Sequence, residues 1–463
     1  MVTLPVPGRK LLKDFAISEN PAVQKQLDRL GALPLPKGSI GLETIRTLLE
    51  RLGNPQDDLP PVFHVAGTNG KGSTCAFLRA MLEAEGHCVH VHTKPHLVRY
   101  NERIRVAGEL ISDAMLAALL EEVFDVAEDL PASFFEVTTA AMFLAFHREP
   151  ADACVIEVGL GGRFDATNVL ERPAACGIAA LGVDHEDWLL QEDVGAPSPE
   201  NKLRRIAFEK AGIVRSSSPL VTQNYPPDAE DEIIRRAGMT RAPLHMRGAD
   251  WWADVGADAI AYRDRHGQLD LPLPSMPGAH QADNAALAVA MLRHQDAVAV
   301  SPAAMATGIR DAHWPARLQY LAKGPLTDLA APRPILLDGG HNPDAAKALA
   351  AHLATVEQPV DAIIGMGRAK DAQQFVEILS AYLASVIAVP IEGHDHVPPS
   401  ELAAMARAAG VPLAHSEPGG IVPAIEWLQS RERPGEPTGG TLLIAGSLYL
   451  AGTVLRANRE WPD

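Results

Sequence analysis

Short apolar segments alternate with amphipathic segments along the chain from residue 61 onward. The apolar segments have the length of buried strands, and most of them end at glycine or polar residues. They are residues 61–66, 87–93, 153–158, 176–183 and 219–223. The segments between them repeat apolar residues at helical spacing, and they are residues 73–86, 113–129, 136–147 and 203–211. This alternation is typical of βα units and predicts an α/β fold on a mostly parallel sheet.

The pattern changes between residues 240 and 275, where short alternating segments and a His-Gly turn predict a small antiparallel excursion. A strong helix is expected next at 281–295, and a polar, proline-containing stretch follows at 311–319. A second βα series then begins. Its expected strands are 335–338, 360–366, 385–389 and 441–447, and its helices are expected to start at Pro343 and Asp371.

This second change of pattern predicts a boundary between two domains near residues 313–318. We expect residues 1–313 to form the first domain, including the antiparallel excursion near 240–275, and residues 318–463 to form a smaller second domain. Two polar segments are expected to be surface loops. One is the proline-rich stretch 432–439, and the other is 191–202, which we expect to be mobile.

The composition agrees with a large folded chain and limits the classes of molecule that it can bind. The 463 residues are 47% hydrophobic and 21% charged, which excludes a disordered chain. The 41 basic and 58 acidic side chains give a formal net charge of −17, whereas affinity for nucleic acid comes largely from clustered Lys and Arg. We therefore expect no nucleic-acid partner, and any anionic ligand should be small and locally bound.

Cysteine usage and hydropathy indicate the compartment. The four cysteines show no C-x-x-C spacing, and three of them lie in apolar runs, where a free thiol behaves as a small apolar group. The N-terminal segment, residues 1–15, has no continuous apolar run, and no stretch of the chain is long and apolar enough for a membrane span. We expect a cytoplasmic protein without a membrane partner, and a monomer by default.

The sequence HVAGTNGKGST, residues 64–74, lies between an expected strand and an expected helix. Its glycines allow backbone conformations in which several N–H groups point at one anion, and the helix N-terminus adds its positive dipole end. Lys71 could reach the outer phosphates, while Ser73 or Thr74 offers a hydroxyl to Mg²⁺. A tight structural turn is the alternative, but a lysine and three glycines in this context favour nucleotide binding. The expected nucleotide-binding residues here are Gly67, Thr68, Asn69, Gly70, Lys71, Gly72, Ser73 and Thr74.

The loop departs from the common G-x-x-x-x-G-K-[ST] pattern, because residue 65 is Val and Gly72 follows the lysine. In this form GTNGK resembles the phosphate loop of the Mur ligase superfamily. GTNGKGS resembles its folate branch, the dihydrofolate synthases and folylpolyglutamate synthases. Further motifs resemble that family in the family's order, namely EVGLGGRFDATN, VDHEDWL, FEKAGIV, PGAHQADNAALA, HWPARLQ, LDGGHNPDAA and AGSLYLAG.

The resemblance implies a P-loop-type, mostly parallel ATPase domain followed by a smaller Rossmann-like α/β domain. It also implies an ATP-dependent ligase that joins the amino group of L-glutamate to a carboxylate of dihydropteroate or of a folate. ATP would activate that carboxylate as an acyl phosphate, so catalysis rests on positioning and charge neutralisation. The implied cofactors are ATP and one or two Mg²⁺ ions, with a monovalent cation as an option and no redox cofactor. The implied partners are small molecules.

The resemblance also implies a catalytic set and a set of metal ligands. Glu157 and His185 fall at or just after the carboxyl ends of expected parallel strands, where open α/β sheets bind ligands; a glutamate there is otherwise a cap or an ion-pair partner. Lys210 matches a lysine that is carbamylated in the superfamily, which requires a neutral amine with a depressed pKa. The alternative is a surface lysine paired with Glu209. The catalytic set is Lys71, Glu157, His185 and Lys210, and the metal set is Ser73, Glu157, His185 and carbamylated Lys210.

Further nucleotide contacts are implied outside the phosphate loop. Asn284 should lie near the base and ribose, and Arg317 should face the β-phosphate. Three residues of the second domain should reach the ribose and phosphates, namely Asp338, His341 and Asn342. The His-Asn-Pro sequence there also reads as a helix N-terminus with proline at its first position, and the two interpretations are compatible. We expect domain closure about residues 313–318 to assemble these groups and exclude water.

The implied substrate residues are Thr93, Lys94, His96, Phe134, Phe135 and Asp165. An aromatic ring could stack on a pterin while a carboxylate accepts its N–H groups; the alternative for the two phenylalanines is a place in the core. Lys94 is a departure, because it replaces a serine that is a metal ligand in the family, and a protonated lysine cannot ligate Mg²⁺. Its charge could stand where an ion would sit, or its side chain could turn to solvent.

The leading interpretation is a bifunctional dihydrofolate synthase/folylpolyglutamate synthase. The motifs leave open a monofunctional form of either activity. They also leave open a related ligase that acts on a non-folate carboxylic acid. A remote alternative is a regulator that binds ATP without catalysing a reaction.

Overall fold

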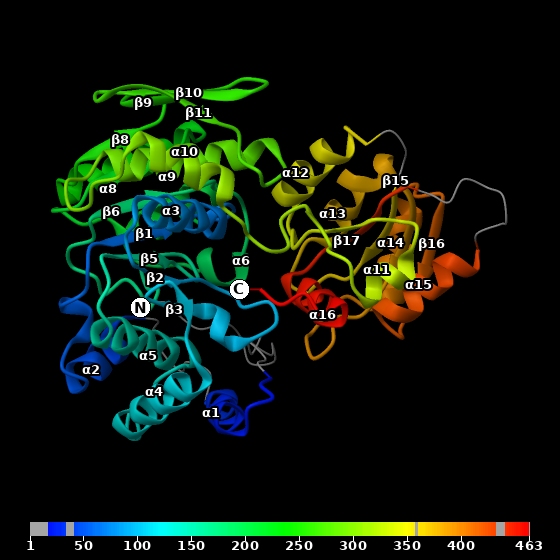
Figure 1. Cartoon of the computed structure of the whole chain (residues 1–463), viewed down its shortest axis with the longest axis horizontal. Helices are drawn as coiled ribbons and strands as arrows, with labels where there is room; N and C mark the ends of the chain where they lie inside the picture. The colour runs from blue at the N-terminus through cyan, green and yellow to red at the C-terminus, as the bar shows by residue number, and fades with distance from the viewer. Residues whose placement is uncertain (1–16, 34–40, 357–359, 432–439, 463) are drawn as a thin grey trace. The chain divides into compact units, whose positions relative to one another are not determined.

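The computed structural model describes residues 17–33, 41–356, 360–431 and 440–462. The chain divides into two compact units (Figure 1): Met1–Ser275 with Gln281–His313, and Met276–His280 with Trp314–Asp463. Each unit has its own main sheet. The expected loop 432–439 and the N-terminal segment 1–15 lie outside the described residues.

The first unit is built on an eight-stranded sheet with the strand order β4-β3-β2-β5-β1-β6-β7-β8. Its strands are β1 (Val62–Ala66), β2 (Val89–His92), β3 (Ile104–Val106), β4 (Glu109–Leu110), β5 (Ala153–Glu157), β6 (Ala175–Ile178), β7 (Leu220–Thr222) and β8 (Leu244–Met246). All pairings are parallel except β2 with β3 and β3 with β4. The central strands are buried throughout, as expected for a parallel sheet covered on both faces. The carboxyl ends of β1, β2, β5 and β6 therefore share one edge.

Helices cover both faces of this sheet (Figure 1), with α4 and α5 on one side and α3, α9 and α10 on the other. The helices are α1 (Pro21–Ala32), α2 (Glu43–Arg51), α3 (Lys71–Glu85), α4 (Asp113–Val126), α5 (Phe134–Arg148), α6 (Glu186–Leu189), α7 (Lys202–Lys210), α8 (Pro227–Thr240), α9 (Ala279–Arg293) and α10 (Pro302–Asp311), with short 3₁₀ turns η1 (Pro55–Asp57), η2 (Tyr100–Arg103) and η3 (Ala211–Ile213). Apolar residues of α1, α2, α4 and α5 share a core with Cys154 and Ile156 of β5. Another core joins α7 and α8 to Cys176 and Ile178 of β6.

A three-stranded antiparallel sheet follows within the same unit. Its strands are β9 (Trp251–Val255), β10 (Ala259–Asp264) and β11 (Gly267–Pro272), in the order β11-β10-β9. The turn between β10 and β11 contains two residues, Arg265 and His266, and Gly267 follows with φ +114°. Ile260 and Tyr262 are buried while their neighbours along β10 are exposed, which is the alternation of a half-covered antiparallel sheet. These strands fall within the range 240–275.

The second unit has a six-stranded sheet in the order β12-β13-β17-β14-β15-β16, parallel except for the pairing of β12 with β13. The strands are β12 (Gln319–Tyr320), β13 (Ile335–Leu337), β14 (Val360–Ile364), β15 (Leu383–Ala388), β16 (Leu413–Ser416) and β17 (Leu442–Ala445). The helices are α11 (Pro325–Ala330), α12 (Pro343–Leu353), α13 (Ala372–Leu379), α14 (Pro399–Ala408), α15 (Ile421–Ser430) and α16 (Leu448–Asn458), with the 3₁₀ turn η4 (Ser380–Tyr382). Residues of β13, β14, β15 and β17 share one core with α12, α13 and α14.

The α/β class with a large, mostly parallel first sheet is confirmed. The expected strand 176–183 is shorter, because the chain leaves the sheet after Ile178 and Ala180 turns its carbonyl toward the phosphate loop. The expected helix 136–147 begins earlier, at Phe134, because Ser133 caps it and exchanges hydrogen bonds with Glu136. Helix α8 was not predicted, although Pro227 suits its first turn. Among the helices that the structure describes, none has the length and hydropathy of a membrane span.

Candidate nucleotide and substrate site

The phosphate loop joins β1 to α3 at the carboxyl edge of the first sheet. Gly67 has φ +154°, and a Cβ atom there would lie 2.9 Å from the Cβ atom of Ala179. Gly70 has φ +82°, and a Cβ atom there would overlap the side-chain oxygen of Asn284. The loop therefore depends on glycine at both positions. Asn284, which was expected near the nucleotide, lies directly against it.

Hydrogen bonds within the loop separate the amides that shape it from those that face a ligand. The N–H groups of Thr68 and Asn69 both donate to the carbonyl oxygen of Ala180, at 2.8 and 3.2 Å. The hydroxyl of Thr68 donates to the carbonyl oxygen of Gly182 at 2.9 Å. The first turn of α3, starting at Lys71, has N–H groups without an acceptor inside the helix. These helix amides, rather than those of Thr68 and Asn69, suit a phosphate group.

Two lysines meet at the carbonyl oxygen of Gly67. The Nζ atom of Lys71 lies 3.0 Å from it and 3.2 Å from the carbonyl oxygen of Thr68, while the Nζ atom of Lys210 lies 2.7 Å from it. Lys210 is the last residue of α7 and is only 4% exposed. Burial, followed by the charge of Lys71, lowers the pKa of Lys210 to about 7. A large fraction of its amine is therefore neutral near pH 7, the state that reacts with CO₂.

The alternative for Lys210, a surface lysine paired with Glu209, is wrong. Glu209 is buried and pairs with Arg163 at 2.8 Å and with Arg205 at 2.9 Å. Arg163 also pairs with Asp193, and the Nε atom of Arg205 donates to the carbonyl oxygen of Leu189. These contacts tie the beginning of the polar segment 191–202 to α7.

Glu157 is the last residue of β5, where it lies opposite Val65 of β1, just before the phosphate loop. Its side chain is buried, and the Oε2 atom accepts a hydrogen bond from the backbone N–H of Lys94 at 3.2 Å. Ser73 and Thr74 are buried in the first turn of α3. The hydroxyl of Thr74 has no hydrogen-bond partner among the described residues.

Glu157, Ser73 and Thr74 offer oxygen donors to the implied Mg²⁺ at the phosphate loop. Within the part of the chain that the structure describes, no three His, Cys, Asp or Glu side chains are placed to hold a metal ion together. Mg²⁺, however, usually takes only one or two protein oxygen ligands when it is bound with a nucleotide, and phosphates and water supply the others. Glu157 with the orphaned hydroxyl of Thr74 and the hydroxyl of Ser73 therefore fits an ion brought by ATP.

His185 lies at the start of α6 with φ +53°, a left-handed conformation that is uncommon outside glycine. Its imidazole is about half exposed, and its Nε2 atom lies 3.9 Å from the Oδ2 atom of Asp184. Asp184 was not singled out from the sequence, although it belongs to the motif VDHEDWL. Its side chain is nearly buried, and its negative charge acts on Lys210 to raise that pKa against the larger effect of burial.

Lys94 follows β2, and its side chain is buried. Only 6% of the side chain is exposed, and the Nζ atom lies 3.9 Å from the Oδ1 atom of Asp165. A Cβ atom on Gly159 would lie 3.3 Å from the same nitrogen, which places the ammonium group over the loop that follows β5. The alternative in which Lys94 turns to solvent is therefore wrong.

Asp165 is occupied by hydrogen bonds from its own loop. Its Oδ2 atom accepts the N–H groups of Gly159 and Leu160, each at 3.0 Å. Its Oδ1 atom accepts the N–H and the hydroxyl of Thr167, at 3.0 and 2.6 Å. Burial alone would raise the pKa of Asp165, but Lys94 and these hydrogen bonds bring it below the usual value. The arrangement is that of a carboxylate that shapes a loop, and its expected contact with a pterin stays a prediction.

Two buried histidines beneath this loop were not anticipated. The Nε2 atom of His64 lies 2.9 Å from the hydroxyl oxygen of Thr167. Because Thr167 donates its only hydroxyl proton to Asp165, its oxygen must accept from His64, which fixes the Nε2-protonated tautomer. Burial, then the positive charges of Arg215 and Lys94, lower the pKa of His64 to about 3 despite Asp165. His92 is also buried, and burial and Lys94 hold its pKa well below the usual value.

The other expected substrate residues divide into buried and exposed groups. Thr93 and His96 are buried, and the Nδ1 atom of His96 accepts a hydrogen bond from Arg103 at 2.9 Å. Phe134 packs against the core of the first unit, as its alternative reading stated, with its ring centroid 6.1 Å from that of Tyr100. Phe135 is 47% exposed at the start of α5. Of the two phenylalanines, Phe135 is the more exposed to a ligand.

In the second unit, the structure joins two of the expected segments. The N–H of Leu318 donates to the Oδ2 atom of Asp338 at 3.0 Å, and the N–H of Gly340 donates to its Oδ1 atom at 2.7 Å. Arg317 is half-buried between Ala316 and Leu318, which both have positive φ values. Such non-glycine strain often marks a functional loop. These contacts hold Arg317 beside the loop that contains His341.

The start of α12 matches the interpretation of the His-Asn-Pro sequence as a helix N-terminus. Pro343 is the first helical residue, and the side-chain oxygen of Asn342 accepts the N–H of Ala345 at 2.9 Å. The Nδ1 atom of His341 lies 3.0 Å from the carbonyl oxygen of Gly339. The nucleotide contacts expected of these residues stay predictions.

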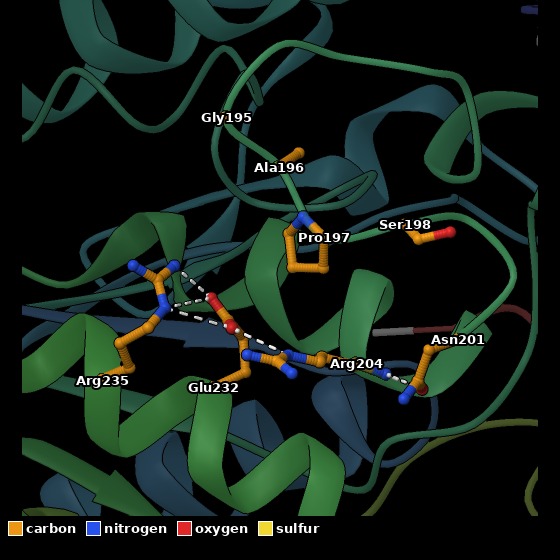
Figure 2. Close-up of a pocket in the computed structure, with 8 residues that line it drawn as sticks. All are labelled: Gly195, Ala196, Pro197, Ser198, Asn201, Arg204, Glu232 and Arg235. Atoms are coloured by element: carbon orange, nitrogen blue, oxygen red, sulfur yellow. Dashed lines mark hydrogen bonds and ion pairs between the residues drawn. The ribbon is translucent and has the colours of Figure 1, made fainter.

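A shallow pocket of about 370 Å³ lies elsewhere in the first unit, below the segment 191–202 (Figure 2). Arg204 of α7 and Arg235 of α8 approach the carboxylate of Glu232 from opposite sides, and Glu232 is fully buried. Both arginines are thus ion-paired with a carboxylate of the protein itself. No residue expected to bind nucleotide or substrate lines this pocket; its lining is Gly195, Ala196, Pro197, Ser198, Asn201, Arg204, Glu232 and Arg235.

Comparison with known proteins places this site in a family. The family model for the C-terminal domain of dihydrofolate synthetase matches residues 327–457. The chain is 35% identical over 357 residues to the dihydrofolate synthase/folylpolyglutamate synthase of Escherichia coli (strain K12). The aligned region covers 76% of this chain and 78% of that protein.

Two solved structures resemble the structure of this protein over nearly the whole chain. Escherichia coli FolC in complex with DHPP and ADP gives a TM-score of 0.80 at 30% identity, covering 95% of this chain and 97% of the other. The bifunctional enzyme from Yersinia pestis, complexed with AMPPNP and a Mn ion, gives a TM-score of 0.80 at 28% identity, covering 94% and 97%. This chain belongs to the dihydrofolate synthase/folylpolyglutamate synthase family, whose fold is of the Mur ligase type.

Proposed function

We propose that this protein is an ATP-dependent ligase that adds L-glutamate to a carboxylate of dihydropteroate and of folates through an acyl phosphate. The observation that carries the proposal is the meeting of Lys71 and Lys210 at Gly67, with Glu157 at the end of the neighbouring strand. Membership of the family supports the same activity. A cytoplasmic, monomeric enzyme is part of the proposal.

The residues of the phosphate loop would position the nucleotide. The first-turn amides of α3 would hold phosphate oxygens, and Lys71 would leave the carbonyl oxygens of Gly67 and Thr68 to neutralise charge on the transferred phosphoryl group. Glu157, Ser73 and Thr74 would hold the Mg²⁺ ion. When bound, that ion polarises phosphate oxygens and neutralises their charge.

Lys210 would act after carbamylation. Its neutral amine would attack the carbon of CO₂, a C–N bond would form as one C=O π pair moves to oxygen, and an N–H proton would leave to solvent, so that a carbamate anion replaces the neutral amine. The pKa of about 7 supports this step, because the free amine is then abundant at neutral pH. The new anion, together with His185, would help to orient that same Mg²⁺ ion. The roles of Asn284 and Arg317 stay as the sequence predicted them.

One assay tests the proposal against its alternatives. Release of ADP is measured with ATP, Mg²⁺ and L-glutamate, and the acceptor is dihydropteroate, tetrahydrofolate or neither. A bifunctional enzyme releases ADP with both acceptors and forms a glutamyl product with each. Activity with one acceptor alone indicates a monofunctional enzyme. Binding of ATP without ADP release with either acceptor would contradict the proposal and would favour the regulator or a ligase for another acid.

A further inference from the structure

Lys94 places a positive charge inside the carboxyl edge of the first sheet. Its side chain is almost fully buried, its ammonium group lies 3.9 Å from the carboxylate of Asp165, and its backbone N–H binds Glu157. Burying an ammonium group is costly unless other groups compensate for the lost hydration. The protein nevertheless keeps this charge beside Asp165, in a residue whose backbone is hydrogen-bonded to the carboxylate that fits the Mg²⁺ ion of ATP.

The groups around Lys94 are poor ligands for an additional ion. Asp165 already accepts four hydrogen bonds, two at each oxygen. His64 and His92 each use one ring nitrogen in a hydrogen bond, with Thr167 and with the carbonyl oxygen of Arg103, and each keeps a second buried nitrogen without a hydrogen-bond partner among the described residues. No three His, Cys, Asp or Glu side chains of the described chain are nevertheless placed to hold a metal ion together. A protonated lysine itself has no lone pair for a metal. Within a few ångströms its charge would also repel a divalent ion.

We propose that the buried ammonium group of Lys94, beside Asp165, takes the place of one divalent ion at the sheet edge where Glu157 lies. The nucleotide complex then holds one Mg²⁺ ion per chain, and Lys94 supplies the remaining positive charge at this edge of the sheet. The inference rests on the proposed function only in that ATP and Mg²⁺ bind at the phosphate loop. It specifies how the charge of the reacting groups is balanced there.

Counting metal ions in the nucleotide complex tests this inference. Mn²⁺ is titrated into the full chain saturated with AMPPNP, and the unbound ion is measured by electron paramagnetic resonance. We expect one tightly bound Mn²⁺ per wild-type chain. The variant Lys94→Ser removes the charge and adds an oxygen ligand, so we expect it to bind two. Two ions in the wild type, or one in Lys94→Ser, would overturn the proposal.

Two control variants separate charge from structure. Lys94→Arg keeps a cation and should bind one Mn²⁺, whereas a count of two would show that charge does not exclude the second ion. Lys25→Ser makes the same substitution at an exposed lysine on α1 and should also bind one. The wild-type count needs no variant, so poor folding of Lys94→Ser leaves the test decisive. Because the count does not depend on turnover, its result is independent of the ADP-release assay.

Discussion

The carboxyl edges of the two main sheets treat buried polar residues in different ways. In the first unit, positive groups gather: Lys94 pairs with Asp165, and two lysines share the carbonyl oxygen of Gly67. In the second unit, Asp338 accepts two backbone N–H groups at the end of β13, and Asn342 caps α12. Both edges read alike in the sequence, as apolar strands followed by polar residues. Among the residues that the structure describes, buried lysine side chains lie at the first edge and none lies at the second, and such charge suits chemistry on phosphates.

The sharpest test of this comparison replaces one carboxylate at each edge. Asp165→Ala should lower the free energy of unfolding by about 3–5 kcal/mol, because it removes a buried carboxylate that faces the ammonium group of Lys94 and accepts four hydrogen bonds from its own loop. Asp338→Ala should cost about 1–3 kcal/mol, the usual loss when buried N–H donors are left without an acceptor. Urea unfolding measures both values.

A double variant provides the control for Asp165. Combining Asp165→Ala with Lys94→Met removes both charges and should recover part of the stability that Asp165→Ala alone loses. Equal losses for Asp165→Ala and Asp338→Ala would contradict the distinction between the two edges.

The next largest effect concerns the activity that depends on Lys210. Lys210→Ala should reduce ligase turnover by roughly 10²–10³-fold, the size typical of one lost electrostatic group in an active site. Added acetate or another short carboxylate should restore part of it by replacing the carbamate. Lys202→Ala changes an exposed lysine at the other end of the same helix and should leave turnover unchanged. Undiminished turnover in Lys210→Ala would remove the residue from the mechanism.

The smallest expected effect, counted per unit of pH, is a pH dependence of stability. The pKa of Lys210 is about 7 in the folded chain and about 10.5 when unfolded. Between these values the unfolded state binds one more proton, so the free energy of unfolding should rise with pH by about 1.4 kcal/mol per unit. Below pH 7 both states are protonated, and the residue destabilises the fold by a constant amount.

The measurement compares wild type with Lys210→Met in CO₂-free buffer, which prevents carbamylation. The stability of the variant relative to the wild type should be greatest below pH 7 and should decline toward pH 10.5. A difference that does not vary with pH would show that Lys210 is not buried as described.

Much of the fold and part of the site could be predicted because their causes are local. The phosphate loop was predictable from Gly67, Gly70 and Lys71, since a glycine turn before a helix makes the same geometry in many proteins. The cap of α12 was predictable from Asn342 and Pro343 for the same reason. The early start of α5 is also local, because Ser133 and Glu136 form its cap. The early end of β6 instead depends on contact between segments, since Ala180 turns toward the phosphate loop.

The sequence by itself determined the α/β class, the phosphate loop and the family, because strand periodicity, glycine spacing and ordered motifs are properties of short segments. Only the tertiary structure decided that Lys94 is buried against Asp165, that Asp165 is occupied by its own loop, and that the pKa of Lys210 falls to about 7. Burial and charge neighbours arise where distant segments meet. A pKa or an ion pair therefore depends on the packed fold, while a turn depends on its own residues.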